Sequence, residues 1–142
     1  MFETLSTQIG AVFMIASIGF AMWKGEEAER SFAAVYLVAW LATMLVQNRT
    51  DLFHLQYGMV AIDLVVLVFL IGLTWKTSRL WPSWALAFHL LAMTGLLIPW
   101  FDLRLPAWSH LAVVNLATLG VMGSLAVGTF WVWQERRAAG LE

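Results

Sequence analysis

Three polar side chains, Asp63, His89 and Asn115, stand inside long apolar stretches of the sequence. An Asp at the centre of a membrane helix costs about 2.5–3.5 kcal/mol on insertion scales, so such a residue faces the bundle interior or water and is a candidate functional residue. By helical rise, Asp63 and Asn115 lie about 12 Å, and His89 about 16 Å, below the same end of their stretches. A carboxylate, an imidazole and an amide therefore share a depth band, where they could hold an ion, a proton or a small molecule.

Three further polar residues extend this candidate site. Gln56 precedes Asp63 by almost two helical turns, and Thr118 follows Asn115 by nearly one turn, so each shares a helical face with its partner. Thr94 lies in the same half of its own stretch, and polar residues are more numerous in this half, which favours a crevice open toward that end. The alternative is structural: polar contacts inside membranes average about 0.6 kcal/mol and can serve only as helix-packing glue.

Two other histidines, His54 and His110, are shallower, with Asp51 and Asp102 in the adjacent loops. An imidazole with a carboxylate suits zinc, and two imidazoles suit a haem. A ligand spacing such as H-E-x-x-H is missing, so neither zinc nor haem is predicted and no cofactor is expected. The sequence also contains no G-x-S-x-G elbow, P-loop or G-x-G-x-x-G motif, so no catalytic residue is assigned and an enzyme is disfavoured.

The composition indicates which elements must position these residues. Of the 142 residues, 61% are hydrophobic and 12% are charged, and the mean hydropathy is +0.79, whereas an average soluble domain has roughly 45–50% apolar and about 25% charged residues. The net charge of −1 leaves no basic excess for nucleic acid, and the lack of cysteine removes disulfides and thiolate chemistry. The sequence therefore predicts an all-α integral membrane protein.

A helix needs about 20 apolar residues to cross a bilayer, and five segments come close to that length. They form a single predicted transmembrane domain over residues 1–140, a bundle of five transmembrane helices with spans at about 5–23, 31–48, 55–75, 82–100 and 107–133. The short loops between them make neighbouring helices antiparallel. Residues 141–142 are typical of a vector-derived addition and are not used.

Lysine and arginine are unevenly divided between the two ends of this bundle. One end receives Lys24, Arg30, Lys76, Arg79, Arg136 and Arg137, and the other only Arg49 and Arg104. By the positive-inside rule, the richer end faces the cytoplasm, so the N-terminus lies outside and the C-terminus inside, in the cell inner membrane. Most tryptophans, Trp81 among them, lie near segment ends, which is typical of an interfacial belt. Residues 24–30 are expected to be a solvated loop without a functional role, with a helix start near Glu26–Glu29.

Small residues recur every fourth position in the last segment, at Gly120, Ser124 and Gly128. Such a stripe lets another helix come close, from this chain or from a second copy. Two functions remain open: binding or transport of a small molecule, ion or proton at the outward polar site, or a non-catalytic scaffold or accessory subunit whose polar residues are glue. The expected partners are the lipid bilayer and a homo-oligomer or membrane partner subunit, and not nucleic acid.

Overall fold

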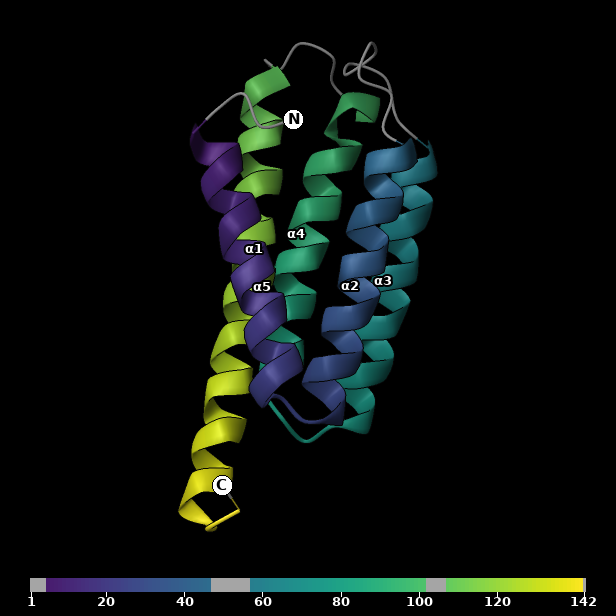
Figure 1. The fold of residues 1–142 in the computed structure, drawn as a ribbon. Coiled ribbons are helices and arrows are strands. Elements are labelled where there is room, and N and C mark those ends of the chain that lie inside the picture. The colour runs from purple at the N-terminus through teal and green to yellow at the C-terminus, as the bar shows by residue number, and fades with distance from the viewer. Residues whose placement is uncertain (1–4, 47–56, 102–106, 142) are drawn as a thin grey trace.

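The structure, a computed structural model, describes residues 5–46, 57–101 and 107–141, and all regular elements in these ranges are helices. They run side by side along one axis (Figure 1) and are α1 (Leu5–Lys24), α2 (Glu27–Val46), α3 (Tyr57–Lys76), α4 (Trp81–Phe101) and α5 (Ala107–Ala138). The all-helical prediction is confirmed, with one helix for each expected segment. Two boundaries differ from expectation, because α2 begins four residues before 31 and α5 continues five residues beyond 133.

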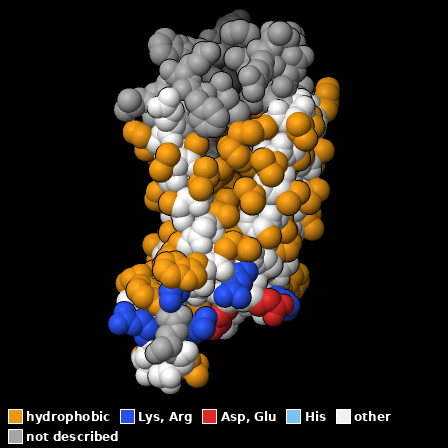
Figure 2. All heavy atoms as spheres, viewed as in Figure 1, with side chains coloured by type: hydrophobic (Ala, Val, Ile, Leu, Met, Phe, Trp, Pro, Cys, Tyr) orange, Lys and Arg blue, Asp and Glu red, His pale blue; other side chains and the backbone are white. Residues whose placement is uncertain are grey.

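Within the described residues, four stretches of helix are long and apolar enough to cross a membrane: Glu27–Val46, Tyr57–Lys76, Trp81–Ile98 and Ala112–Ala138. The apolar part of α1, Gln8–Lys24, is shorter. Large apolar side chains cover the outside of the bundle at middle height, whereas Lys and Arg gather at its lower end (Figure 2). An apolar surface of this kind is the surface that lipid chains would cover.

The five helices close into a ring. Each helix packs against its neighbours in sequence, α5 returns to pack against α1, and α2 also touches α5 across the ring. The most extensive of these contacts joins α4 to α5. Side chains from four or five helices can therefore meet at one height in the interior.

The stripe of small residues on α5 belongs to this α4–α5 contact. A side chain at Gly120 would collide with the Phe88 ring, and one at Gly128 would collide with the Trp81 ring. These glycines therefore let two aromatic rings of α4 lie directly on the α5 backbone. Within the described bundle, the stripe faces a neighbour in the same chain, and Ser124 between the glycines donates a hydrogen bond to the Gly120 carbonyl at 2.8 Å.

The apolar core fills the half of the bundle near the α1–α2 and α3–α4 connections. Its fully buried side chains include Phe32 of α2, Leu70 of α3 and Leu125 of α5, and Ile18 of α1 joins them. Trp81 of α4 completes this core with only 4% of its surface exposed. The expectation that Trp81 belongs to an interfacial belt is therefore wrong for this one residue.

A buried carboxylate explains why the Trp81 indole can enter the core. The Glu29 side chain, with no exposed surface, accepts hydrogen bonds from Trp81 Nε1 at 2.8 Å and from the Glu26 backbone N–H at 3.0 Å. The second bond is the back-reaching half of a capping box, because Glu29 is the third residue of α2 and Glu26 precedes the helix. Glu29 thus caps α2, whose first residue, Glu27, agrees with the helix start expected near Glu26–Glu29, and fastens α2 to α4. The expectation that residues 24–30 are solvated is wrong for Glu29, which is fully buried.

A second polar link at the same end holds the last turns of α5. The Arg79 guanidinium, between α3 and α4, contacts Glu26 Oε2 at 3.0 Å and Glu135 Oε2 at 3.2 Å. Arg79 therefore joins the α1–α2 connection to the part of α5 that extends past the other helices (Figure 1).

Candidate functional site

Four polar residues lie in the middle of the bundle, each on a different helix: Tyr36 of α2, Asp63 of α3, His89 of α4 and Thr118 of α5. We call these residues the mid-bundle cluster. Tyr36, Asp63 and Thr118 are partly buried, and His89 has only 3% of its surface exposed. The cluster lies where the apolar core ends, since Val66, less than one turn after Asp63, is already fully buried.

One hydrogen bond in the cluster joins α4 to α3. His89 Nε2 lies 3.0 Å from the backbone carbonyl oxygen of Asp63. A carbonyl can only accept, so Nε2 carries the hydrogen of this bond and Nδ1 remains available for a second interaction. The bond therefore uses the backbone of Asp63 and not its side chain.

The Asp63 carboxylate takes no part in that hydrogen bond, but neighbouring side chains interact with it electrostatically. It interacts electrostatically with His89 on one side and with Tyr36 on another. Thr118 of α5 also interacts with the Tyr36 hydroxyl, at the place where α2 touches α5. Asp63 thus interacts with an imidazole and with a phenol, and each of these three groups can bind or release a proton.

Among the six residues predicted for this site, Asp63, His89 and Thr118 come together, while the others do not join the described contacts. Asn115 and Thr94 are exposed on α5 and α4, and the Thr94 hydroxyl donates to the Leu90 carbonyl of its own helix at 2.9 Å. Depth predicted Asn115, but depth does not fix direction around the helix axis, and residues three apart point about 60° away from each other. Gln56 lies outside the described residues.

Tyr36 is the member of the cluster that the sequence analysis did not select. The predicted boundary of the second span started it at residue 31, which placed Tyr36 close to the cytoplasmic end. Because α2 begins at Glu27, Tyr36 is in the middle of the helix and at the depth of the cluster. The helix start expected near Glu26–Glu29 carries the signal, because counting depth from that start instead of from residue 31 places Tyr36 in the middle of the helix.

The weaker metal candidates cannot be placed. His54 lies outside the described residues, and His110 is in α5, but its side chain is outside the description. The described ranges contain no group of three or more His, Asp or Glu side chains arranged to hold a metal ion.

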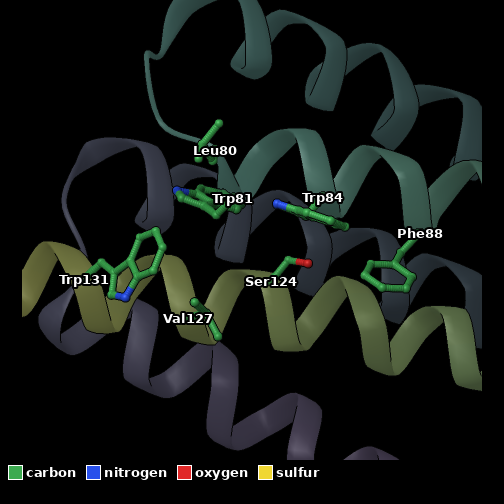
Figure 3. Close-up of a pocket in the computed structure, with 7 residues that line it drawn as sticks. All are labelled: Leu80, Trp81, Trp84, Phe88, Ser124, Val127 and Trp131. Atoms are coloured by element: carbon green, nitrogen blue, oxygen red, sulfur yellow. The ribbon is translucent and has the colours of Figure 1, made fainter.

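A separate groove of about 250 Å³ opens on the outer surface between α4 and α5. Figure 3 shows Trp84 of α4 and Trp131 of α5 on either side of Ser124, with Phe88 at one end of the groove. Trp84 and Trp131 are both more than half exposed, at 63% and 57%. The groove is almost entirely apolar and lies apart from the mid-bundle cluster, so it adds no ionisable group to the candidate site.

No protein-family model, curated protein or solved structure matches this chain.

Proposed function

We propose that the chain is a five-span protein of the inner membrane, with its N-terminus outside and its C-terminus in the cytoplasm, whose mid-bundle cluster binds a proton or a small cation. In this proposal the Asp63 carboxylate binds and releases the proton or cation. His89 and Tyr36 adjust its affinity and pass protons to and from it, and Thr118 orients Tyr36. The site opens toward the outer end of the bundle and serves binding or transport.

The observation that supports this proposal is the position of the Asp63 carboxylate. It interacts electrostatically with His89 and Tyr36, while the His89 ring is hydrogen-bonded to the Asp63 backbone carbonyl. A carboxylate inside an apolar bundle is costly, so residues of this kind are rare and commonly mark proton or ion pathways. The bond from His89 Nε2 to the Asp63 carbonyl fixes the imidazole at 3.0 Å from the α3 backbone. This anchor leaves the carboxylate itself available to a proton or a cation.

A second candidate function is supported by the same bond. His89 and the Tyr36–Thr118 pair join α3 to α4 and α2 to α5, so the cluster also has the geometry of helix-packing glue. The protein would then be a scaffold or accessory subunit of a membrane complex. Under this alternative, the ionisation of Asp63 has no role in the function, and the hydrogen bond of His89 stabilises the fold.

The replacement Asp63→Asn separates the two candidates, because asparagine keeps the shape of aspartate and cannot take up a proton. Purified protein is reconstituted into vesicles that contain a pH-sensitive dye, and proton uptake under an imposed membrane potential is followed at several values between about pH 5 and 8, where histidine changes charge. The thermal unfolding of the same proteins is measured in detergent over the same range. If the site binds protons, Asp63→Asn abolishes the uptake or flattens the pH dependence of unfolding.

Matched controls come from the exposed polar residues at similar depth. Asn115→Ala and Thr94→Val should leave both readouts unchanged, because neither side chain is part of the described cluster. The glue alternative predicts instead that Asp63→Asn is silent and that His89→Leu lowers the free energy of unfolding by about 1 kcal/mol through the lost hydrogen bond. The proton site would be contradicted if the parent protein takes up no protons and Asp63→Asn leaves the pH dependence of thermal unfolding unchanged.

A further inference from the structure

A second carboxylate is buried in the bundle, and the mid-bundle cluster does not use it. Glu29 of α2 has no exposed surface, and it accepts hydrogen bonds from Trp81 Nε1 at 2.8 Å and from the Glu26 backbone N–H at 3.0 Å. Both donors are neutral, and no Lys or Arg of the described ranges forms an ion pair with Glu29. A buried carboxylate without a cation is costly, and in membrane proteins such residues commonly mark proton pathways.

Glu29 lies on the same face of α2 as Tyr36 of the cluster. Phe32 follows Glu29 by three residues and Tyr36 follows Phe32 by four, which turns all three side chains toward the bundle interior. By helical rise, Glu29 and Tyr36 are about 10 Å apart along the axis. The fully buried Phe32 ring lies between them, with its centre 5.5 Å from the Tyr36 ring and 5.7 Å from the Trp81 ring. One aromatic ring therefore separates the cluster from the Glu29 carboxylate and its indole partner.

On its other side, Glu29 is joined through Glu26 to the surface at the charged end of the bundle. Glu26 donates its backbone N–H to Glu29 and lines a cavity of about 400 Å³ between the start of α2 and the end of α3. Water reaches this cavity, because the Glu27 and Lys76 side chains in its wall are 91% and 77% exposed. The charged groups at this place are Glu26, Glu27, Lys76 and Arg79 in the wall, and Glu135 of α5, which contacts Arg79.

Between Glu29 and the cluster, the packing of the bundle is apolar. One helical turn from the cluster, four helices each contribute a side chain with at most 1% of its surface exposed: Phe32 of α2, Val66 of α3, Ala85 of α4 and Met122 of α5. We call these four residues the apolar layer. A metal cation needs oxygen ligands in place of its water, and these side chains offer none. A proton needs only a short-lived file of water molecules, because it passes from one water to the next. The apolar layer therefore favours the proton over a metal cation.

We propose that the mid-bundle cluster binds the proton rather than a metal cation, and that Glu29 is the second proton site, between the cluster and the charged end of the bundle. This inference rests on the proposed function. The proton leaves the Asp63 carboxyl group, crosses the apolar layer through water that enters when the Phe32 ring turns, and binds to a Glu29 oxygen. Asp63 thereby gains the negative charge that Glu29 loses. Glu29 then releases the proton to water in the cavity at Glu26, and the same steps run in reverse.

Two variants that disturb Glu29 differently test this inference in the vesicle uptake assay. Glu29→Gln removes the proton acceptor, and it should slow proton uptake about 100-fold, a typical contribution of a positioned acid or base to proton transfer. Trp81→Phe removes the 2.8 Å hydrogen bond to the same carboxylate but keeps the carboxyl group, so uptake should persist. A purely structural Glu29 would make the two variants alike, because each of them breaks the same contact.

The parent protein supplies a measurement that needs no variant to fold. Under the same imposed potential, it should take up protons and no radioactive sodium. Sodium uptake by the parent, equal uptake by Glu29→Gln and the parent, or equal losses in Glu29→Gln and Trp81→Phe would overturn the inference. The Asp63 site stands in each of these cases if Asp63→Asn removes the pH dependence of unfolding. A parent protein without proton uptake, whose pH dependence Asp63→Asn still removes, would retain proton binding at Asp63 and overturn the transfer to Glu29.

Discussion

Replacing Glu29 by alanine should be among the most destabilising changes at the charged end of the bundle. The side chain is fully buried, and its two oxygens accept hydrogen bonds from Trp81 Nε1 at 2.8 Å and from the Glu26 N–H at 3.0 Å. A hydrogen bond to a charged group contributes about 1.5–3 kcal/mol, and a buried donor left without an acceptor costs about 1–3 kcal/mol. Two stranded donors therefore predict a loss of about 3–5 kcal/mol for Glu29→Ala, toward the upper range for single substitutions.

Partial replacements divide this loss between the two bonds. Glu29→Gln retains an oxygen for the indole N–H but turns its amide nitrogen toward the Glu26 N–H, so we expect a loss of about 1–3 kcal/mol. Trp81→Phe removes the indole donor and keeps an aromatic ring in the core, with a similar loss. Because the two residues touch, the double variant Glu29→Ala/Trp81→Phe should show a coupling energy of about 1–3 kcal/mol.

The measurement is reversible unfolding of the purified protein in mixed detergent micelles, followed by circular dichroism so that the removal of one tryptophan does not disturb the signal. The matched control is Glu27→Ala, in the same first turn of α2, whose side chain is 91% exposed and lies 3.7 Å from Lys76 Nζ. This exposed ion pair should contribute at most about 1 kcal/mol. The reasoning is refuted if Glu29→Ala costs no more than Glu27→Ala, or if the losses from Glu29→Ala and Trp81→Phe simply add.

Three further predictions concern the helix contacts and the topology. Gly128→Ala should destabilise the bundle because the new methyl group meets the α4 indole, whereas Gly123→Ala, with open space at the same atom, should be neutral or stabilise by up to about 1 kcal/mol in thermal unfolding. Arg79→Gln should speed hydrogen exchange in the last turns of α5, because it removes the contacts at 3.0 and 3.2 Å, and added salt should produce part of the same effect in the parent protein. For the proposed orientation, a C-terminal fusion should be active with a cytoplasmic reporter and inactive with alkaline phosphatase, and the reverse pattern would contradict an internal C-terminus.

Apolar stretches of sequence were enough to predict the helices, because each helix must satisfy its own backbone hydrogen bonds and cover itself with apolar side chains. The ends were predicted less well, since they depend on single contacts. The α2 start depends on the Glu29 carboxylate, whose second partner, Trp81, lies 52 residues away and cannot be read from local sequence. A tryptophan beside a charged loop has the same local pattern whether it enters the headgroup region or the core.

The candidate site shows the same division between depth and direction. Counting residues along a helix predicts depth, and this count selected Asp63 and His89, whose helices meet through a bond at 3.0 Å. The direction of a side chain around the axis depends on which helices are neighbours. Asn115 lies at the depth of the cluster but is exposed. Tyr36 is assigned to that depth only when the count along α2 starts at Glu27. The order of helices around the ring supplies the missing information.

The closure of the ring between the first and last helices has a consequence for biogenesis. During synthesis, α1 emerges long before α5, yet α5 supplies its packing surface and also contacts α2 and α4. Until α5, which begins at Ala107, has been made, α1 has only α2 to pack against, and Tyr36 lacks its neighbour Thr118. Assembly of the ring is therefore completed in one late step, in which α5 joins α1, α2 and α4.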